Sequence, residues 1–160
     1  MIYTLRPYQA TDAATLNRVA VSAFKELTTY YDDGPVILAN VAKMSELSQT
    51  AELIIATFDK RLVGGVAYVP PGTEKRHFPT ELPCICMLVV DPNHRGQGVG
   101  RSLTQACIER AKRDKALRIG LHTSPIMEVA LPLYLRMGFV KEADIEAIRG
   151  VPYAVYYKTL

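Results

Sequence analysis

Three alternating glycines are the clearest candidate for chemistry in the sequence. Gly96, Gly98 and Gly100 follow one arginine, Arg95, and precede another, Arg101. Glycine lets the main chain adopt conformations that a side chain would forbid, and it leaves room for a ligand to reach the main-chain N–H groups. A helix predicted to start at Gly98 would add unpaired N–H groups and a partial positive charge. The pattern therefore predicts an anion site suited to a diphosphate.

Three kinds of phosphate-binding loop have to be compared at this position. A P-loop requires Lys followed by Ser or Thr directly after the glycines, and the sequence has neither pair there. A dinucleotide-binding loop requires the spacing GxGxxG directly after a strand, with an acidic residue about 20 positions later. Here the spacing is GxGxG, and the connector 91–95 separates it from the preceding apolar run. The third candidate is a loop that binds coenzyme A.

Two sequence blocks together resemble the GNAT superfamily of N-acetyltransferases. The segment 95–100, Arg-Gly-Gln-Gly-Val-Gly, matches the diphosphate loop of that family, R/Q-x-x-G-x-G/A, and Val90-x-Pro92 matches its lead-in. The segment from Ala130 to Phe139 matches the family's later block, A-x-x-L-Y-x-x-x-G-F. Because the two blocks occur in the family's order and spacing, they are more specific together than either is alone. The resemblance extends over nearly the whole chain.

The resemblance implies acetyl-coenzyme A (acetyl-CoA) as acetyl donor and cofactor. In the family the pantetheine arm pairs with the main chain of a strand, which is matched here by residues 86–90. Leu88 and Val90 would supply these main-chain contacts, and an N–H near Leu88 or Val89 would hold the developing oxyanion. One departure is Met127, which stands where the family often has an asparagine that contacts the cofactor. The residues expected around the diphosphate are Arg95, Gly96, Gln97, Gly98, Val99, Gly100 and Arg101.

Tyr134 matches the tyrosine with which the family protonates the departing thiolate. A phenol has an ordinary pKa of about 10, so it keeps its proton at neutral pH and can act as a general acid. On spacing alone, the same tyrosine would be a packing residue of an amphipathic helix. The glutamate that the family often uses as a base is missing from residues 84–90. A water-mediated route or one of Glu81, His77 and His122 would take the proton from the amine.

The acceptor is expected to be a small-molecule or peptide amine. In the family it binds under the first two helices and the loop between the last strands. The predicted substrate-binding residues are Tyr30, Tyr31 and Glu81. Acidic residues in these segments would attract a cationic amine. The charged and aromatic residues of this predicted surface are Asp32, Asp33, Asp144, Glu146, Arg149 and Tyr153.

Hydrophobic periodicity predicts the elements that must position these residues. The predicted strands are 2–8, 52–58, 62–69, 84–90, 117–123, 139–141 and 153–158. The predicted helices begin near residues 12, 36, 98 and 125, and Pro132 within the last one predicts an irregular turn that aims Tyr134. Alternating strands and helices in the second half predict a mixed sheet covered by helices. With the resemblance, we expect an α/β fold of the α+β type, with a mostly antiparallel sheet of six to seven strands and about four helices.

Composition limits the class of protein. The chain has 160 residues, of which 49% are hydrophobic and 22% are charged, so we expect one globular domain over residues 2–160. The net charge of +3 is too small to predict nucleic-acid binding. No apolar stretch reaches the ~20 residues of a membrane span. Three cysteines without metal-ligand spacing predict no disulfide framework and no metal site, and they favour a cytoplasmic location.

These observations predict an acetyl-CoA-dependent N-acetyltransferase that uses direct attack of a primary amine in a ternary complex. The alternative is a catalytically silent sensor of acyl-CoA with the same fold. Either protein is compatible with a homodimer, and neither requires a membrane or a nucleic acid as partner.

Overall fold

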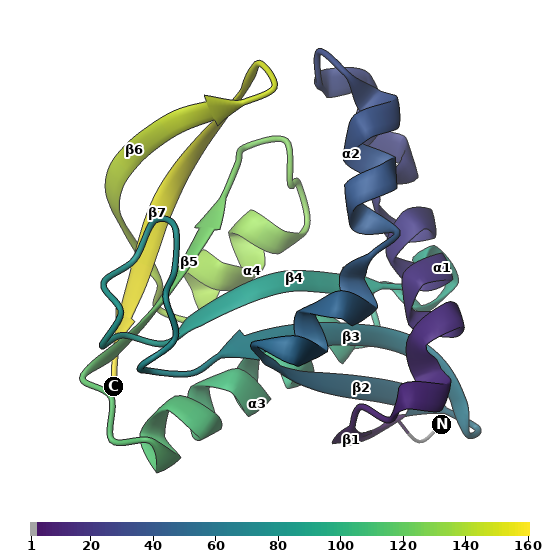
Figure 1. The fold of residues 1–160 in the computed structure, drawn as a ribbon, viewed down its shortest axis with the longest axis horizontal. Coiled ribbons are helices and arrows are strands. Elements are labelled where there is room, and N and C mark those ends of the chain that lie inside the picture. Colours follow the sequence, from purple (N-terminus) through teal and green to yellow (C-terminus); the bar gives the residue numbers. More distant parts are fainter. Residues whose placement is uncertain (1–2) are drawn as a thin grey trace.

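The fold is built on one seven-stranded sheet (Figure 1). The computed structural model describes residues 3–160, so Ile2, the predicted start of the domain and of the first strand, lies outside the described residues. The strand order is β1-β2-β3-β4-β5-β7-β6, and all neighbours are antiparallel except β4 and β5. The strands are β1 (Tyr3–Pro7), β2 (Glu52–Phe58), β3 (Arg61–Val69), β4 (Cys84–Val90), β5 (Arg118–Thr123), β6 (Val140–Ile148) and β7 (Val151–Thr159).

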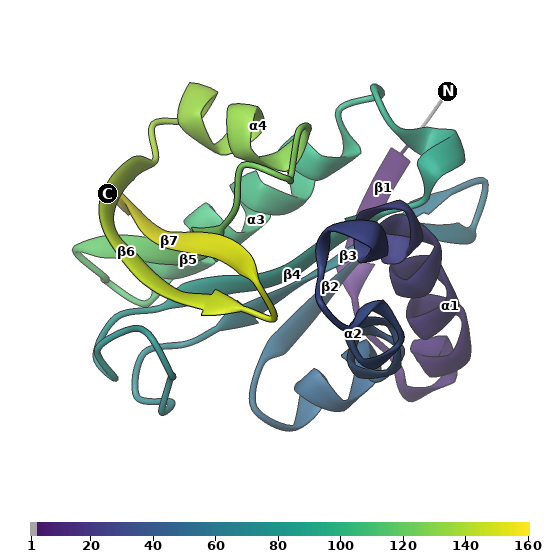
Figure 2. The ribbon, with the colours of Figure 1, turned by 90° about the horizontal axis from the view of Figure 1, so that it is seen from above.

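Helices cover both faces of this sheet (Figure 2). Helices α1 (Ala13–Phe24) and α2 (Gly34–Val41) pack on one face, and α3 (Val99–Arg113) and α4 (Ala130–Arg136) pack on the other. Each face has its own hydrophobic core, as expected for a sheet between two helix layers. The order of elements and the fold class predicted from the sequence are confirmed. Within residues 3–160, no helix is long and apolar enough to cross a bilayer.

Strands β4 and β5 separate from one another along their length. They pair at a single register position, where Cys84 lies opposite Gly120, and Figure 1 shows β5 rising away from β4. On the other side of β4, the register with β3 shifts between Gly65 and Ala67, and Met87 has a φ of +54°. This irregularity is a β-bulge, which removes a main-chain group from the ladder and bends the strand. The sheet is therefore open at its centre.

Two hairpin turns are shorter than the loops that the predicted strands left between them. Asp59 and Lys60 connect β2 to β3, and Arg149 and Gly150 connect β6 to β7; all four have positive φ. Two-residue turns of this kind match the twist of the strands that they join.

Strand β6 extends over Val140–Ile148, so the predicted strand 139–141 was too short. Most residues of β6 are exposed and show no hydrophobic alternation, which is why the sequence pattern did not indicate its full length.

The helix predicted to begin at Pro125 begins at Ala130 instead. The preceding residues form an irregular turn, in which the Met127 N–H donates to the Ser124 carbonyl at 2.9 Å. Pro132 therefore lies in the first turn of α4, where a main-chain N–H has no partner within the helix in any case. An irregular turn does precede Tyr134, but it lies before Ala130 and not at Pro132, and the predicted helix start near residue 125 is wrong.

Replacing Pro132 tests this arrangement. Because proline is tolerated in a first turn, Pro132→Ala should change the free energy of unfolding by less than about 1 kcal/mol. The matched substitution Gln105→Pro, within α3, should cost about 3 kcal/mol. Urea denaturation measures both. A gain of about 3 kcal/mol on Pro132→Ala would show that the helix starts earlier.

Candidate active site

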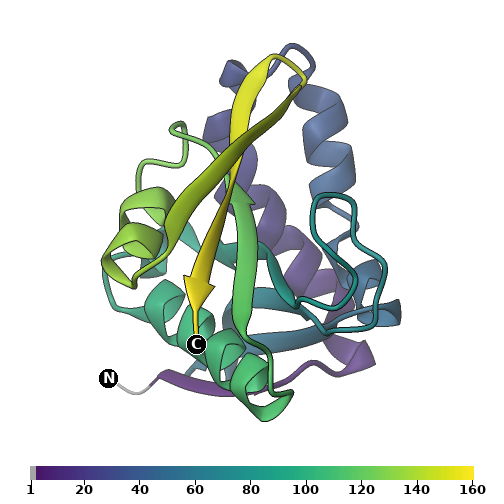
Figure 3. The same cartoon turned by 90° about the vertical axis from the view of Figure 1, so that its left-hand side faces the viewer.

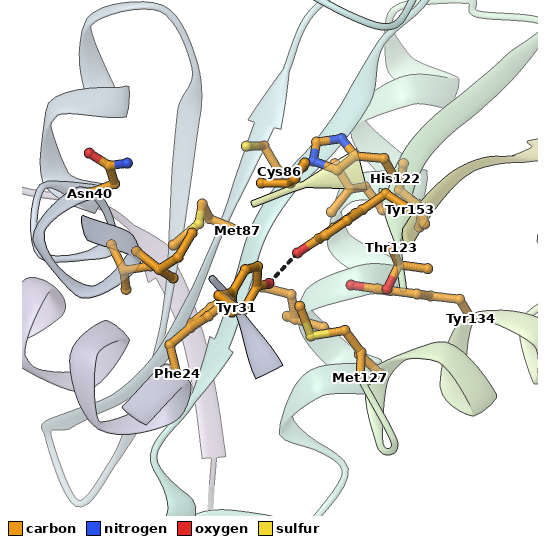
Figure 4. Close-up of a pocket in the computed structure, with 17 residues that line it drawn as sticks. Phe24, Tyr31, Asn40, Cys86, Met87, His122, Thr123, Met127, Tyr134 and Tyr153 are labelled. Atoms are coloured by element: carbon orange, nitrogen blue, oxygen red, sulfur yellow. Dashed lines mark hydrogen bonds between the residues drawn. The ribbon is translucent and has the colours of Figure 1, made fainter. Parts of the chain in front are cut away.

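Two adjoining cavities occupy the opening beside β4. The large groove, of about 730 Å³, runs along residues 94–101 and the segment 126–136. The small cavity, of about 190 Å³, is open on one side and is lined mainly by residues of α1, α2, β4, β5 and β7 (Figure 4). The two adjoin, because four residues line both: Phe24, Leu88, Met127 and Ala130.

The glycine loop forms one end of the large groove. Gly96 and Gly98 have φ values of +74° and +84°, and a Cβ at either position would meet nothing within 4 Å. Gly98 is the N-cap of α3 and provides no side-chain cap, so the first N–H groups of the helix are available to a ligand. Gly100 differs from the expectation, because its φ is not positive and a Cβ there would meet Leu133 at 3.5 Å. Left-handed backbone is required at two of the three glycines.

The side chains of Arg95, Gln97 and Arg101 differ in whether they face the large groove. The Arg95 guanidinium is paired with the Glu26 carboxylate and donates to the Ala23 carbonyl at 3.1 Å, so it connects the loop to the end of α1. Arg101 is exposed and lines the large groove. Gln97 is exposed and does not line it. Of these three predicted cofactor contacts, Arg101 is the side chain left free to face an anion in the groove.

Tyr134 lies on the wall of the small cavity. Its side chain is only 6% exposed, and its ring packs edge-to-face on Phe139 with centroids 5.7 Å apart. Figure 4 shows its hydroxyl directed into the cavity beside Thr123. Burial raises the pKa of Tyr134, and the nearby thiols of Cys107 and Cys86 raise it further. The phenol therefore keeps its proton at neutral pH and can donate it.

A pair of tyrosines closes the other side of the small cavity. The hydroxyls of Tyr31 and Tyr153 are 2.5 Å apart and hydrogen-bonded (Figure 4). Beside them, the Asp32 N–H donates to the Arg149 carbonyl at 2.8 Å. These two contacts connect the segment before α2 to the β6–β7 turn, which lies next to it in Figure 3. Tyr31 and Tyr153 thus both reach the site, although they are far apart in sequence.

His122, on β5, also lines the small cavity. Its ring lies between those of His77 and Tyr153, at centroid distances of 5.5 and 5.6 Å. Its Nδ1 is buried and has no hydrogen-bond partner in the described part of the chain. Burial lowers the pKa of His122 to about 4, and repulsion from His77 contributes. The imidazole is therefore neutral at pH 7.

Several predicted acceptor residues lie elsewhere. Tyr30 is exposed and lines the large groove rather than the small cavity. Glu81, which was predicted to bind the substrate, is exposed in the loop before β4 and lines neither cavity. Asp33 accepts from the Val36 N–H at the start of α2.

Two further acids lie outside the small cavity because they are on the exposed strand β6. Asp144 and Glu146 are on this strand, and Asp144 pairs with Lys141. Among the residues that the structure describes, no Asp, Glu, Lys or Arg lines the small cavity. The acids predicted around the acceptor therefore lie outside the small cavity.

From the sequence, the apolar residues that line the small cavity could be identified only as packing residues. Phe24 belongs to the predicted hydrophobic stripe of the first helix, and Leu121 to an apolar strand. Met87 lies in the apolar run of β4, and nothing in that run indicates a bulge. Apolar residues that line a cavity and those that fill a core have the same periodicity, so the pattern could not separate them.

Comparisons with known proteins agree with the geometry. A sequence model described as the acetyltransferase (GNAT) family matches residues 16–139. The protein YqkA of Bacillus subtilis, named UPF0157, is 29% identical over 160 residues, which are 98% of this chain and 43% of that protein. The chain thus spans somewhat less than half the length of this curated relative.

Solved structures of low sequence identity share the fold. A GCN5-related N-acetyltransferase structure from Rhodopseudomonas palustris superposes with a TM-score of 0.76 at 23% identity, covering 100% of this chain and 99% of the other. The structure of yncA from Salmonella typhimurium, titled as a complex with its cofactor acetyl-CoA, has a TM-score of 0.70 at 16% identity and covers 99% and 94% of the two chains.

The neutral state of His122 predicts how stability depends on pH. The pKa is about 4 in the folded protein and 6.5 in the unfolded chain, so the unfolded chain takes up the proton first as pH falls. The His122 contribution should thus reduce the free energy of unfolding by about 2 kcal/mol between pH 7 and pH 5, with no effect above pH 7. His122→Gln should lack this component. Urea denaturation of both proteins at the two pH values measures it, and equal pH dependence would contradict it.

Proposed function

Because the chain belongs to the GNAT acetyltransferase family, we propose that it transfers the acetyl group of acetyl-CoA to a primary amine. One observation carries the proposal. An open loop of main-chain N–H donors at the start of α3 lies at one end of a groove, and the groove adjoins a cavity that is lined by Tyr134. A long anionic donor and a small acceptor can thus meet at Leu88, which lines both spaces.

The large groove has the features that coenzyme A requires. Diphosphate oxygens would accept from the N–H groups of residues 96–101, with the positive end of α3 and the charge of Arg101 adding attraction. The pantetheine arm would lie beside β4, where the separation from β5 leaves main-chain groups near Leu88 and Val90 without a neighbouring strand. Val89 would take part through its main chain, because its side chain packs in the core under α1.

We assign the remaining roles to groups around Leu88. Acetyl-CoA supplies a thioester, whose carbonyl carbon the amine nitrogen attacks, so that a C–N bond forms and the C–S bond breaks. The main-chain N–H released by the bulge at Met87 and Leu88 would donate to the developing oxyanion. Tyr134 would donate its hydroxyl proton to the departing sulfur. The proton lost from the nitrogen passes through water and restores the phenol.

Deprotonation of the incoming ammonium is assigned to water. His122 is the histidine that lines the small cavity, and with a pKa of about 4 it is too weak a base to deprotonate an alkylammonium ion. Its neutral ring can accept or donate a hydrogen bond and so orient the amine. Glu81 and His77 line neither cavity.

Filling the groove at Gly100 tests the donor site. A valine there would add methyl groups against Leu133 on the groove wall, without the strain that positive φ would impose at Gly98. Gly100→Val should raise the dissociation constant of acetyl-CoA at least about tenfold. Ser102→Val, on the exposed side of the same helix, is the matched control and should bind normally. Titration calorimetry measures both, and normal binding by Gly100→Val would argue against this groove as the donor site.

Removing one oxygen atom tests the proton donor. Tyr134→Phe should lower kcat by about 10²-fold or more, because the leaving sulfur loses its proton source, while acetyl-CoA affinity stays nearly unchanged. Tyr156→Phe is the matched control, since Tyr156 is equally buried and lines neither cavity. Release of CoA with an amine panel is the measurement. Unchanged turnover in Tyr134→Phe would contradict the assignment of Tyr134 as the proton donor. Binding of acetyl-CoA by the wild-type protein without any turnover would indicate the alternative, a sensor of acyl-CoA.

A further inference from the structure

The wall of the small cavity is apolar and uncharged. In the portion of the chain described by the structure, none of its lining residues is Asp, Glu, Lys or Arg. The polar groups that reach it are neutral hydroxyls, an amide and the imidazole of His122, whose lowered pKa keeps it uncharged at pH 7. Its apolar wall includes Phe24, Ile37, Val41, Met87, Leu121 and Ile148.

Two acids of the segment before α2 lie outside the cavity. Asp33 accepts from the Val36 N–H at the start of α2. Asp32 lies against the β6–β7 turn, so close that a Cβ on Gly150 would come within 2.5 Å of its carboxylate. A second charge on a bound acceptor would therefore find no counter-ion among the residues that line the cavity, and the water that it loses there would not be replaced.

The cavity is also small. Its volume is about 190 Å³. An apolar protein cavity of about 150 Å³ is enough to hold benzene. Drug-sized ligands occupy pockets of roughly 300–1,000 Å³. The space therefore fits one ring or a short aliphatic chain together with an amine.

The arrangement of the walls gives the acceptor a direction. Figure 4 shows Thr123 and Tyr134 on one side of the cavity, with Asn40 of α2 on the other. The reacting nitrogen has to lie at the Tyr134 side, next to Leu88, where the two cavities meet. The rest of the molecule then extends toward the apolar side chains of α2 and the end of β6.

We propose that the acceptor is a small primary amine with an uncharged, apolar body, about the size of one benzene ring. This inference rests on the proposed function. Amines that carry a second charge are excluded by the lack of a partner on the wall. Specificity thus depends on the absence of a charged partner on the wall as well as on the apolar contacts that the wall makes.

A pair of amines of equal length tests this directly. Hexylamine and 1,5-diaminopentane have the same number of non-hydrogen atoms, and they differ in a terminal methyl or ammonium group. The kcat/KM of hexylamine should exceed that of the diamine by at least about 50-fold after correction for the two amino groups. Phenethylamine should behave like hexylamine. Release of CoA measures the rates, and a shift of the melting temperature in the presence of CoA measures amine binding without turnover.

A carboxylate placed on the wall should weaken the preference. Asn40→Asp changes one exposed rim residue to an acid of the same shape, which can pair with the far ammonium group of the diamine. The ratio of kcat/KM for hexylamine over the diamine should fall at least tenfold. Gln105→Glu makes the same change in charge on α3, lines neither cavity, and should leave the ratio unaltered.

The outcomes separate this inference from the proposed function. Equal or faster turnover of the diamine, or faster turnover of a short peptide N-terminus than of either amine, would overturn the inference and leave acetyl transfer intact. Absence of turnover with every amine would instead contradict the proposed function. The melting-temperature shift then decides the inference, which is supported if hexylamine stabilises the CoA-bound protein more than the diamine does, and overturned if it does not.

Discussion

The separation of β4 from β5 is the constraint on which the rest of the structure depends. Parallel neighbours ordinarily exchange hydrogen bonds along their whole length. Here they pair only where Cys84 meets Gly120. The small cavity lies between the diverging strands and is lined by both, while the large groove continues along β4 with the segment 126–136 on its other side. Each β4 group that faces the space and would have bonded to β5 must find another partner, which in the proposed function is the pantetheine arm.

Elements distant in sequence hold the glycine loop at the end of that space. Arg95 reaches back to the carbonyl of Ala23 at the end of α1. His94, directly before it, is hydrogen-bonded through Nδ1 to the Tyr3 hydroxyl at 3.1 Å, and its ring lies against Phe58. The loop is therefore fixed on both sides while its glycines stay open. A preorganised set of donors of this kind binds an anion with little ordering cost.

The sequence predicted the features that depend on local rules. The element order and the open conformation of Gly96 and Gly98 follow from propensity and spacing, and the structure agrees. Strand β6 was predicted too short, because an edge strand exposed on most positions has no alternation. The charge of the small cavity was not predictable, because its wall combines residues from distant elements, such as Phe24 and Tyr153. Asp32 and Asp33 directly follow Tyr31 in the sequence, yet neither lines the cavity, and Asp33 accepts from the Val36 N–H at the start of α2.

The neutral wall and the lack of a carboxylate base have one physical consequence. An alkylammonium ion loses its hydration in an apolar cavity, so burial lowers the pKa of the amine and favours the free base. A carboxylate on the wall would do the opposite, because it would stabilise the ammonium form and hold the proton on the nitrogen that has to attack. The cavity around Tyr134 thus favours the nucleophilic form by desolvation. On this account the wall that selects an apolar acceptor is also what prepares its nitrogen, and a separate strong base is not required.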